Sequence, residues 1–223
     1  MLISVHVGKT AGSSFGKSLL EHYGDRMLSD YGNAPMSYTR FQRRANAVLK
    51  GARSFVYPFS GIECIQGHFL PIKYLALKYR RNAQFITWMR DPVERVASHY
   101  HYWKRLYDPT KASTLQRRLV EEDWSLERFC LHPQLQNAFS EYYWLFPLEK
   151  FDFVGVMEHY DEDFAYFSKC FFGKTLEVRR DNVNPDKGEG YVTDPDLRAR
   201  IEAFHADDMA LYKKALALRE SRP

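Results

Sequence analysis

The chain has 223 residues, of which 45% are hydrophobic and 27% are charged. It is long and apolar enough to form a buried core, which excludes an intrinsically disordered protein. The formal net charge of +4 suits an anionic ligand but is too small for a dedicated nucleic-acid-binding protein, so we expect no nucleic-acid partner.

Five short apolar runs predict strands, and segments of helical pattern separate most of them. The runs are Leu2–Val7, Ser54–Tyr57, Cys64–Gln66, Gln84–Met89 and Phe153–Met157. Strands that alternate with helices favour a parallel sheet covered by helices on both faces. We therefore predict an α/β fold in which residues 1–223 form a single domain. It should be a three-layer sandwich with a central parallel sheet flanked by helices, similar to the P-loop NTPases.

Three sites in the chain are typical of helix starts. One helix should follow the first strand, from about Ser13 to His22. A second should begin at residues 91–94, where Asp91 can cap, Pro92 suits the first helical position and Glu94 would complete a capping-box pattern. The third, at residues 194–195, predicts one last helix. Its apolar side would carry Leu197, Ile201, Phe204, Leu211 and Ala215.

The loop after the first strand is the first motif that carries chemistry. Its sequence is Gly8-Lys9-Thr10-Ala11-Gly12-Ser13-Ser14. The two glycines permit a sharp turn, the lysine adds a positive charge, and the hydroxyls and a following helix N-terminus add hydrogen-bond donors. Such a loop fits a phosphate group, although a tight turn capped by its first serine would also explain it.

The triplet Gly8-Lys9-Thr10 is similar to the end of a Walker A motif, which binds nucleoside triphosphates. That motif needs another glycine five positions before Gly8, where this chain has Ile3. An ATP-dependent phosphotransferase therefore remains only an alternative.

The second motif covers residues 90–100. Arg90 follows the strand Gln84–Met89, and its guanidinium can hold a phosphate through two hydrogen bonds. Ser98 lies about two turns into the following helix, so both can reach one ligand that lies along the inner face of that helix. The plainer interpretation is a surface arginine before an ordinary helix start.

Taken together, the loop at residues 9–15 and the sequence Arg-Asp-Pro-Val-Glu-Arg-x-x-Ser-x-Tyr at residues 90–100 resemble the PAPS-dependent sulfotransferase family. The resemblance is nearest to the heparan sulfate 2-O-sulfotransferase-like branch and its bacterial relatives. It implies transfer of a sulfo group from 3′-phosphoadenosine-5′-phosphosulfate (PAPS) to a hydroxyl. We expect no metal in this step, because the sequence has no clustered carboxylates to hold magnesium. The resemblance also implies that Arg90 and Ser98 hold the 3′-phosphate. The residues that it assigns to the 5′-phosphosulfate are Lys9, Thr10, Ala11, Gly12, Ser13 and Ser14.

The resemblance extends more weakly to other parts of the chain. Residues 154–158 are similar to a late strand of the family, and residues 182–185 (Asn-Val-Asn-Pro) stand where the family has a ligand-closing loop. The pair Gly67-His68 resembles the position of the catalytic base in the 2-O-sulfotransferase-like branch. We expect His68 to be the base and Lys9 to stabilise the bridging oxygen.

Other interpretations of these residues stay open. A histidine at a strand end is often a structural residue, and Glu63 and Glu158 are the reserve candidates for the base. His99 and His101, two positions apart on a helix, do not share a face, so we expect no zinc pair and no metal site. A non-catalytic nucleotide-binding relative also remains possible.

The sequence gives less information about the acceptor than about the donor. We expect a hydroxyl-bearing small molecule or a glycan. The basic segment Tyr38–Arg53 could meet an anionic glycan, although a solvated helix face is the preferred explanation. The segment Tyr102–Trp124 could line an acceptor cleft.

The three cysteines, Cys64, Cys130 and Cys170, form no CxxC pair, so we expect free, buried thiols rather than disulfides. No run of 18 apolar residues occurs, and residues 1–7 read as a strand rather than a signal peptide. We expect a cytoplasmic protein, unless an anchor precedes Met1.

Overall fold

The structure is a computed structural model that describes residues 1–31, 38–174, 176–177 and 190–222. The described residues include five strands, which form one sheet in the order β2-β3-β1-β4-β5. Every pairing in it is parallel. The strands are β1 (Leu2–Val5), β2 (Met27–Asp30), β3 (Cys64–Gly67), β4 (Gln84–Met89) and β5 (Phe153–Val156). Because β1 lies between β3 and β4, the segments that follow these three strands leave the sheet side by side.

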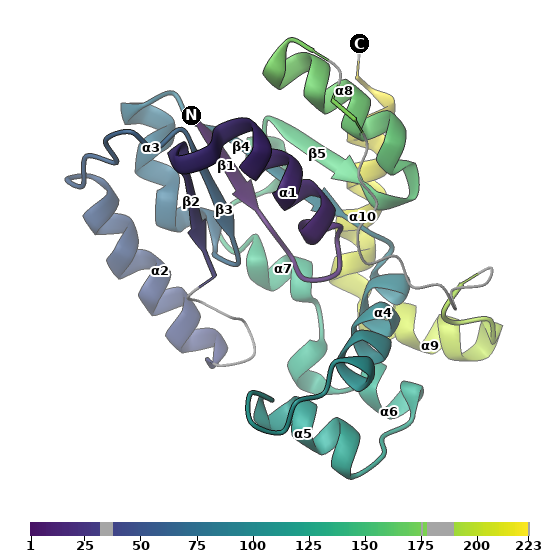
Figure 1. The fold of residues 1–223 in the computed structure, drawn as a ribbon. Coiled ribbons are helices and arrows are strands. Elements are labelled where there is room, and N and C mark those ends of the chain that lie inside the picture. Colours follow the sequence, from purple (N-terminus) through teal and green to yellow (C-terminus); the bar gives the residue numbers. More distant parts are fainter. Residues whose placement is uncertain (32–37, 175, 178–189, 223) are drawn as a thin grey trace.

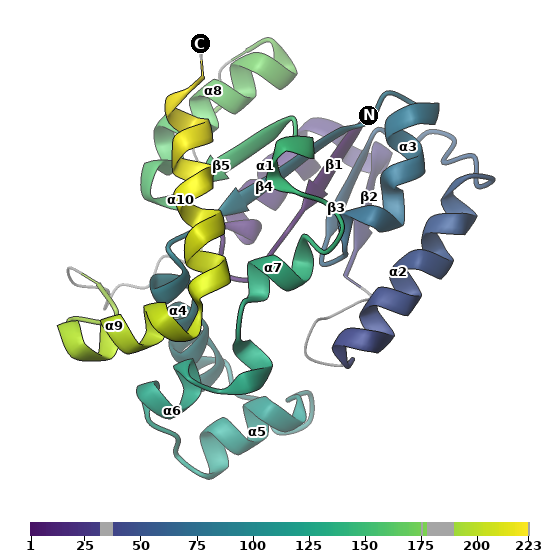
Figure 2. The same ribbon diagram turned by 180° about the vertical axis from the view of Figure 1, so that it is seen from behind.

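Ten α-helices lie in the described residues and surround the sheet. They are α1 (Gly12–Tyr23), α2 (Arg40–Ser54), α3 (Leu75–Arg80), α4 (Pro92–Arg105), α5 (Thr114–Glu121), α6 (Leu126–Cys130), α7 (Ala138–Tyr142), α8 (Tyr160–Phe172), α9 (Pro195–Phe204) and α10 (Ala206–Glu220). Helices α1 and α8 cover one face of the sheet (Figure 1), and α3, α7 and α10 cover the other (Figure 2). The predicted three-layer α/β sandwich with a parallel central sheet is therefore confirmed.

The alternation of side chains along the strands explains the two covered faces. In β4, Ile86 and Trp88 pack with α1 and α8, whereas Phe85 and Met89 pack in the core on the opposite face. All four side chains are almost fully buried. Burying a side chain of this size contributes about 1.5–3 kcal/mol, so both faces of this strand hold the layers together.

A third apolar cluster lies outside the sheet, beyond the two that cover its faces. It is formed by α4, α5, α6 and α9, which pack on one another below the sheet in Figure 1. Trp103, Trp124 and Phe129 are its largest members. This helical layer faces the carboxyl ends of the strands, where open α/β sheets bind their ligands.

Two of the strand predictions differ from the structure. Strand β2 was not predicted, because Met-Leu-Ser-Asp lacks β-branched residues and forms a half-exposed edge. The prediction of a strand at Ser54–Tyr57 is wrong. Ser54 ends α2, and the amide N–H groups of Phe55 and Val56 donate to carbonyls of that helix, so local helical hydrogen bonds override the β-forming composition.

The start of α4 agrees with its sequence in part. The carboxylate of Asp91 accepts hydrogen bonds from the amides of Val93 and Glu94, as predicted for a cap. The predicted capping box is wrong, because the amide of Asp91 donates to Glu158 at 3.0 Å. The carboxylate of Glu94 accepts instead from the amide of Tyr191.

The predicted single last helix is in fact two helices that meet at His205. The Asp194 cap of α9 is confirmed, since its carboxylate accepts from the amides of residues 196 and 197. The buried ring of His205 accepts from the amide of Asn137 at 3.2 Å and lies 2.9 Å from the carbonyl oxygen of Cys130. These tertiary bonds fix a break that no local signal marks.

Three further expectations concern the cysteines, the late loop and membrane helices. Cys64 and Cys130 are buried free thiols as expected, but Cys170 is exposed, since it lies on the outer face of α8. The proposed ligand-closing residues 182–185 lie outside the described residues. No helix in the described ranges is both long enough and apolar enough to cross a lipid bilayer.

Candidate active site

The loop between β1 and α1 folds as a tight turn. The hydroxyl of Thr10 donates to the carbonyl of Val7 at 2.7 Å, and the amide of Phe15 donates to the carbonyl of Ala11 at 3.0 Å. Lys9 and Ala11 have φ angles of 73° and 55°, in the left-handed region. That conformation costs a non-glycine residue on the order of 1 kcal/mol and tends to occur where a site needs it.

The ammonium of Lys9 lies among positive charges. Its Nζ is 3.7 Å from the centroid of the Tyr102 ring on α4, a cation–π contact. Burial, and then the charges of Arg90 and Arg105, lower the pKa of Lys9 to about 8. No carboxylate among the described residues pairs with it. A partly buried cation held in this way favours an anionic ligand.

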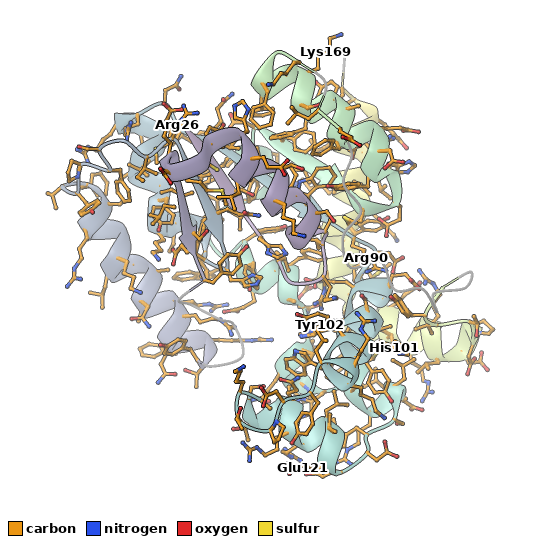
Figure 3. The ribbon with its side chains drawn as sticks, viewed as in Figure 1. Arg26, Arg90, His101, Tyr102, Glu121 and Lys169 are labelled. Atoms are coloured by element: carbon orange, nitrogen blue, oxygen red, sulfur yellow. The ribbon has the colours of Figure 1, made fainter. Side chains whose placement is uncertain are left out.

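Arg90 stands where β4 gives way to α4, beside the Lys9 loop (Figure 3). Its guanidinium lies 3.6 Å from the carboxylate of Glu94, and its Cζ lies 5.6 Å from the centroid of the Tyr191 ring. The two predicted motifs therefore meet at one edge of the sheet because β1 pairs directly with β4. Ser98 is buried two turns further along α4.

His68 follows the last residue of β3 and is held by the neighbouring strand end. Its Nδ1 lies 2.6 Å from the backbone carbonyl oxygen of His6. A carbonyl only accepts, so Nδ1 carries the proton and Nε2 carries the lone pair. Burial lowers the pKa of His68, although the bond to His6 works in the opposite direction. At neutral pH the ring is therefore neutral and can take up a proton at Nε2.

The ring of His6 connects the histidine to the loop. It stacks on the ring of His68 with centroids 4.5 Å apart, and it fills the space beside Gly12. Burial lowers the pKa of His6 well below its usual value, and so do the neighbouring His68 and Lys9. The pKa of His99 on α4 is also well below its usual value. Burial is the main cause, and the nearby Arg95, Lys9 and His68 add to it. The candidate site is thus a basic, largely buried region.

Sequence reasoning missed several of these residues. His6 lies only two positions before the first motif, but a histidine at a strand end carries no signal of its own. Arg95, inside the second motif, is buried, and its Nε and one terminal nitrogen form no hydrogen bond with the described residues. Tyr102 belongs to the predicted aromatic and basic segment, yet its contact with Lys9 depends on how α4 lies against the loop.

The two reserve candidates for the base have other surroundings. Glu63 precedes β3 and pairs with Arg26, so it lies at the amino edge of the sheet, opposite the edge that holds His68 and the Lys9 loop. Glu158 follows β5, but its two carboxylate oxygens accept from the amide of Asp91 and the hydroxyl of Tyr212, each at 3.0 Å. It fastens the start of α4 to α10 instead.

The remaining predicted residues are the two histidines of α4 and the two serines of the first motif. His99 packs on Trp103 and His101 stacks on Tyr191, with ring centroids 4.2 and 5.0 Å apart, so the two histidines have separate neighbours. Within the described part of the chain, no three His, Cys, Asp or Glu side chains are grouped as metal ligands would be. Ser14 is buried at the start of α1, and the side chain of Ser13 is outside the described structure.

Comparisons with known proteins concern the fold. No protein-family model matches the chain, and no curated protein matches its sequence. A solved structure does match: a sulfotransferase from Alicyclobacillus acidocaldarius, with a TM-score of 0.51 and 18% sequence identity. The match covers 100% of this chain and 96% of the other. The chain shares the fold of that sulfotransferase. At this identity the likeness establishes the fold alone, and it does not single out the heparan sulfate 2-O-sulfotransferase-like branch.

Proposed function

We propose that this protein transfers a sulfo group from PAPS to an acceptor hydroxyl. The observation that carries the proposal is the meeting of Lys9 and Arg90 at neighbouring strand ends, close enough for the charge of one to lower the pKa of the other. A ligand with two separate anionic groups would relieve that repulsion. PAPS has such groups at its 5′ and 3′ positions. The shared fold with a protein described as a sulfotransferase supports the same function.

The donor would lie across the two motifs. In this proposal the backbone amides and Lys9 of residues 9–14 bind the 5′-phosphosulfate, and Arg90 and Ser98 bind the 3′-phosphate. The hydroxyl of Thr10 already donates its proton to the carbonyl of Val7, so we assign its backbone N–H to the ligand. The turn at Ala11 and Gly12 brings the N-terminus of α1 toward the same group, where the helix dipole favours negative charge.

The chemical step requires positioning, charge stabilisation and one proton transfer. The bond between sulfur and the bridging oxygen of the donor breaks as the acceptor oxygen bonds to sulfur in line. Lys9 stabilises the charge that develops on the bridging oxygen. His68 takes the proton of the acceptor hydroxyl at Nε2, the atom its bond to His6 leaves as an acceptor. The products are adenosine 3′,5′-bisphosphate and the sulfated acceptor.

The acceptor class follows only from the sequence resemblance. The pair Gly67-His68 and both motifs resemble the 2-O-sulfotransferase-like branch, so we propose a carbohydrate-like hydroxyl. Tyr31 and Tyr142 lie edge-on to the His68 ring, with centroids 4.9 and 6.3 Å away. The ring of Tyr31, which is 43% exposed, would suit the apolar face of a sugar, whereas the ring of Tyr142 is buried.

Thermal unfolding with three nucleotides tests the donor. Adenosine 3′,5′-bisphosphate should raise the melting temperature. At a hundredfold excess over Kd, the free energy of unfolding should increase by roughly 3 kcal/mol. Adenosine 5′-phosphate should act far more weakly because it lacks the 3′-phosphate. A larger effect of ATP with magnesium would favour the phosphotransferase alternative. Binding of the bisphosphate without sulfation of any carbohydrate or alcohol acceptor would favour a non-catalytic relative.

A further inference from the structure

Helix α2 is amphipathic in the reverse of the usual sense. Its buried side consists of small residues, Ala47, Gly51 and Ser54, and the position of Gly51 lies so close to the neighbouring segment that a Cβ there would be 3.1 Å from the carbonyl oxygen of Ile72. Its large apolar side chains point to solvent instead. Phe41 has an exposed fraction of 80%.

The exposed apolar residues form one continuous stripe. Residues 41, 45, 48, 52 and 55 recur at intervals of four and three, which places them on one face of a helix. Leu49 and Val56 border this face and are 67% and 80% exposed. The described chain has twelve large exposed apolar residues, and seven of them lie between positions 38 and 57. We call this face, from Phe41 to Val56, the α2 stripe. A concentration of exposed apolar side chains of this kind marks an interaction surface for a protein or a membrane.

The charges around the stripe are of one sign. No Asp or Glu occurs from residue 31 to residue 62, whereas α2 contains Arg40, Arg43, Arg44, Lys50 and Arg53. The carboxylate of Glu141 on α7 lies within 4 Å of the guanidinium groups of the first three. The segment itself keeps a net positive charge, because it contains no acidic residue.

The neighbouring helix extends the positive surface. Arg80, at the end of α3, donates to the carbonyl of Ser54 at 2.8 Å, and Arg81 donates to the carbonyl of Phe59 at 2.6 Å. These bonds fasten the C-terminal end of the α2 stripe and add two guanidinium groups beside it. In both views α2 lies at the margin of the molecule, so its outer face can meet a flat surface (Figures 1 and 2).

We propose that the α2 stripe docks on an anionic lipid membrane. The apolar side chains would enter the boundary between headgroups and acyl chains, and the exposed Arg40, Lys50 and Arg53 would bind the negative headgroups. Pairing of two copies through this face would bring together two segments that carry five cations each and contain no acidic residue of their own. A nucleic acid would leave the apolar side chains unused. The proposal goes beyond the proposed function and does not depend on it.

Co-sedimentation of the full chain with vesicles tests this docking. The protein should bind vesicles that contain roughly 30% phosphatidylserine, bind poorly to pure phosphatidylcholine, and be released by salt. Leu49→Ser should weaken binding to the anionic vesicles about tenfold, because the buried area of one leucine side chain is lost. The charge reversal Arg53→Glu should weaken it as well.

Leu145→Ser is the matched control, since Leu145 is 65% exposed but lies outside the α2 stripe. It should bind the anionic vesicles as the unchanged protein does, and circular dichroism should show that all variants fold. Equal losses for Leu49→Ser and Leu145→Ser would overturn the proposal. So would an absence of binding to anionic vesicles at low salt. Sedimentation velocity that shows a dimer dissociated by Leu49→Ser, without vesicle binding, would assign the surface to self-association instead.

Discussion

The imidazole of His6 occupies the space into which a side chain at position 12 would project. A Cβ placed on Gly12 would lie 1.8 Å from Cε1 of His6. The same ring stacks on His68, and the carbonyl oxygen of His6 holds Nδ1 of His68. The loop at residues 8–14 and the candidate base are therefore packed against the same residue, His6. A substitution in the loop should alter the position of His68.

Gly12→Ala should destabilise the protein by about 1–3 kcal/mol, because either His6 or the loop must move to make room. His6→Ala opens that space, so the double variant should be more stable than the sum of the two single effects predicts. Chemical denaturation of the four proteins gives this interaction energy.

Gly8→Ala is the control for that cycle, since a Cβ on Gly8 would have no heavy atom within 4 Å. Its free energy of unfolding should change by less than that of Gly12→Ala. Strict additivity of the His6 and Gly12 substitutions would show that the ring is not the obstacle.

His68→Ala should lower turnover about 10²–10⁴-fold, the usual contribution of a positioned general base. Affinity for adenosine 3′,5′-bisphosphate should hardly change, because His68 is assigned to the acceptor. Since burial lowers the pKa of His68, the unchanged enzyme should keep its activity at neutral pH and lose it only as pH falls below the usual histidine range. Initial rates as a function of pH and calorimetric binding measure the two quantities.

His159→Ala is a suitable control for the base, because His159 is exposed at the start of α8. It should have normal turnover. Normal turnover in His68→Ala as well would place the base elsewhere, and loss of donor binding in that variant would make His68 a structural residue.

Arg90→Ala should weaken binding of adenosine 3′,5′-bisphosphate by roughly 2–3 kcal/mol, the scale of hydrogen bonds to a charged group. It should affect adenosine 5′-phosphate much less, because that nucleotide has no 3′-phosphate. Arg90→Lys should restore only part of the difference, since an ammonium cannot form the paired contact of a guanidinium. Equal losses for both nucleotides in calorimetry would show that Arg90 binds a different group.

Local chemistry in the sequence predicted the elements that depend on neighbouring residues. The Asp91 and Asp194 caps follow from side chains within three positions of the helix start, whereas α1 begins at Gly12 without a side-chain cap. The break at His205 could not be predicted, because its partners are at residues 130 and 137. For the same reason β2 was missed, since its four residues form a strand only through pairing with β3.

The same distinction between local and distant contacts applies to the candidate site. The two motifs and the strands before them were legible, because glycine, lysine and arginine at strand ends have few other uses in combination. The order of the sheet is what brings Lys9 beside Arg90, and no single segment contains it. The packing of His6 under Gly12 and of Tyr102 against Lys9 likewise depends on distant contacts.

Without ligand, the lowered pKa of Lys9 links stability to pH. Its folded pKa is about 8 and its ordinary value is 10.5, so between these values the unfolded chain binds more protons than the folded protein. The contribution of Lys9 to the free energy of unfolding should therefore rise with pH across this range and be constant below about pH 8. Lys9→Met should flatten this rise in denaturation experiments at a series of pH values.

Ligand binding should reverse the shift at Lys9. A phosphate beside the ammonium favours its charged form, so the pKa of Lys9, about 8 in the free protein, should rise in the complex. Adenosine 3′,5′-bisphosphate should then bind with uptake of a proton above pH 8, and its affinity should fall as the pH increases further. Because a guanidinium stays charged, Lys9→Arg should bind without this uptake. Calorimetry in two buffers of different ionisation enthalpy measures the number of protons. The same uptake in Lys9→Arg would assign the proton to another group and remove Lys9 from contact with the donor.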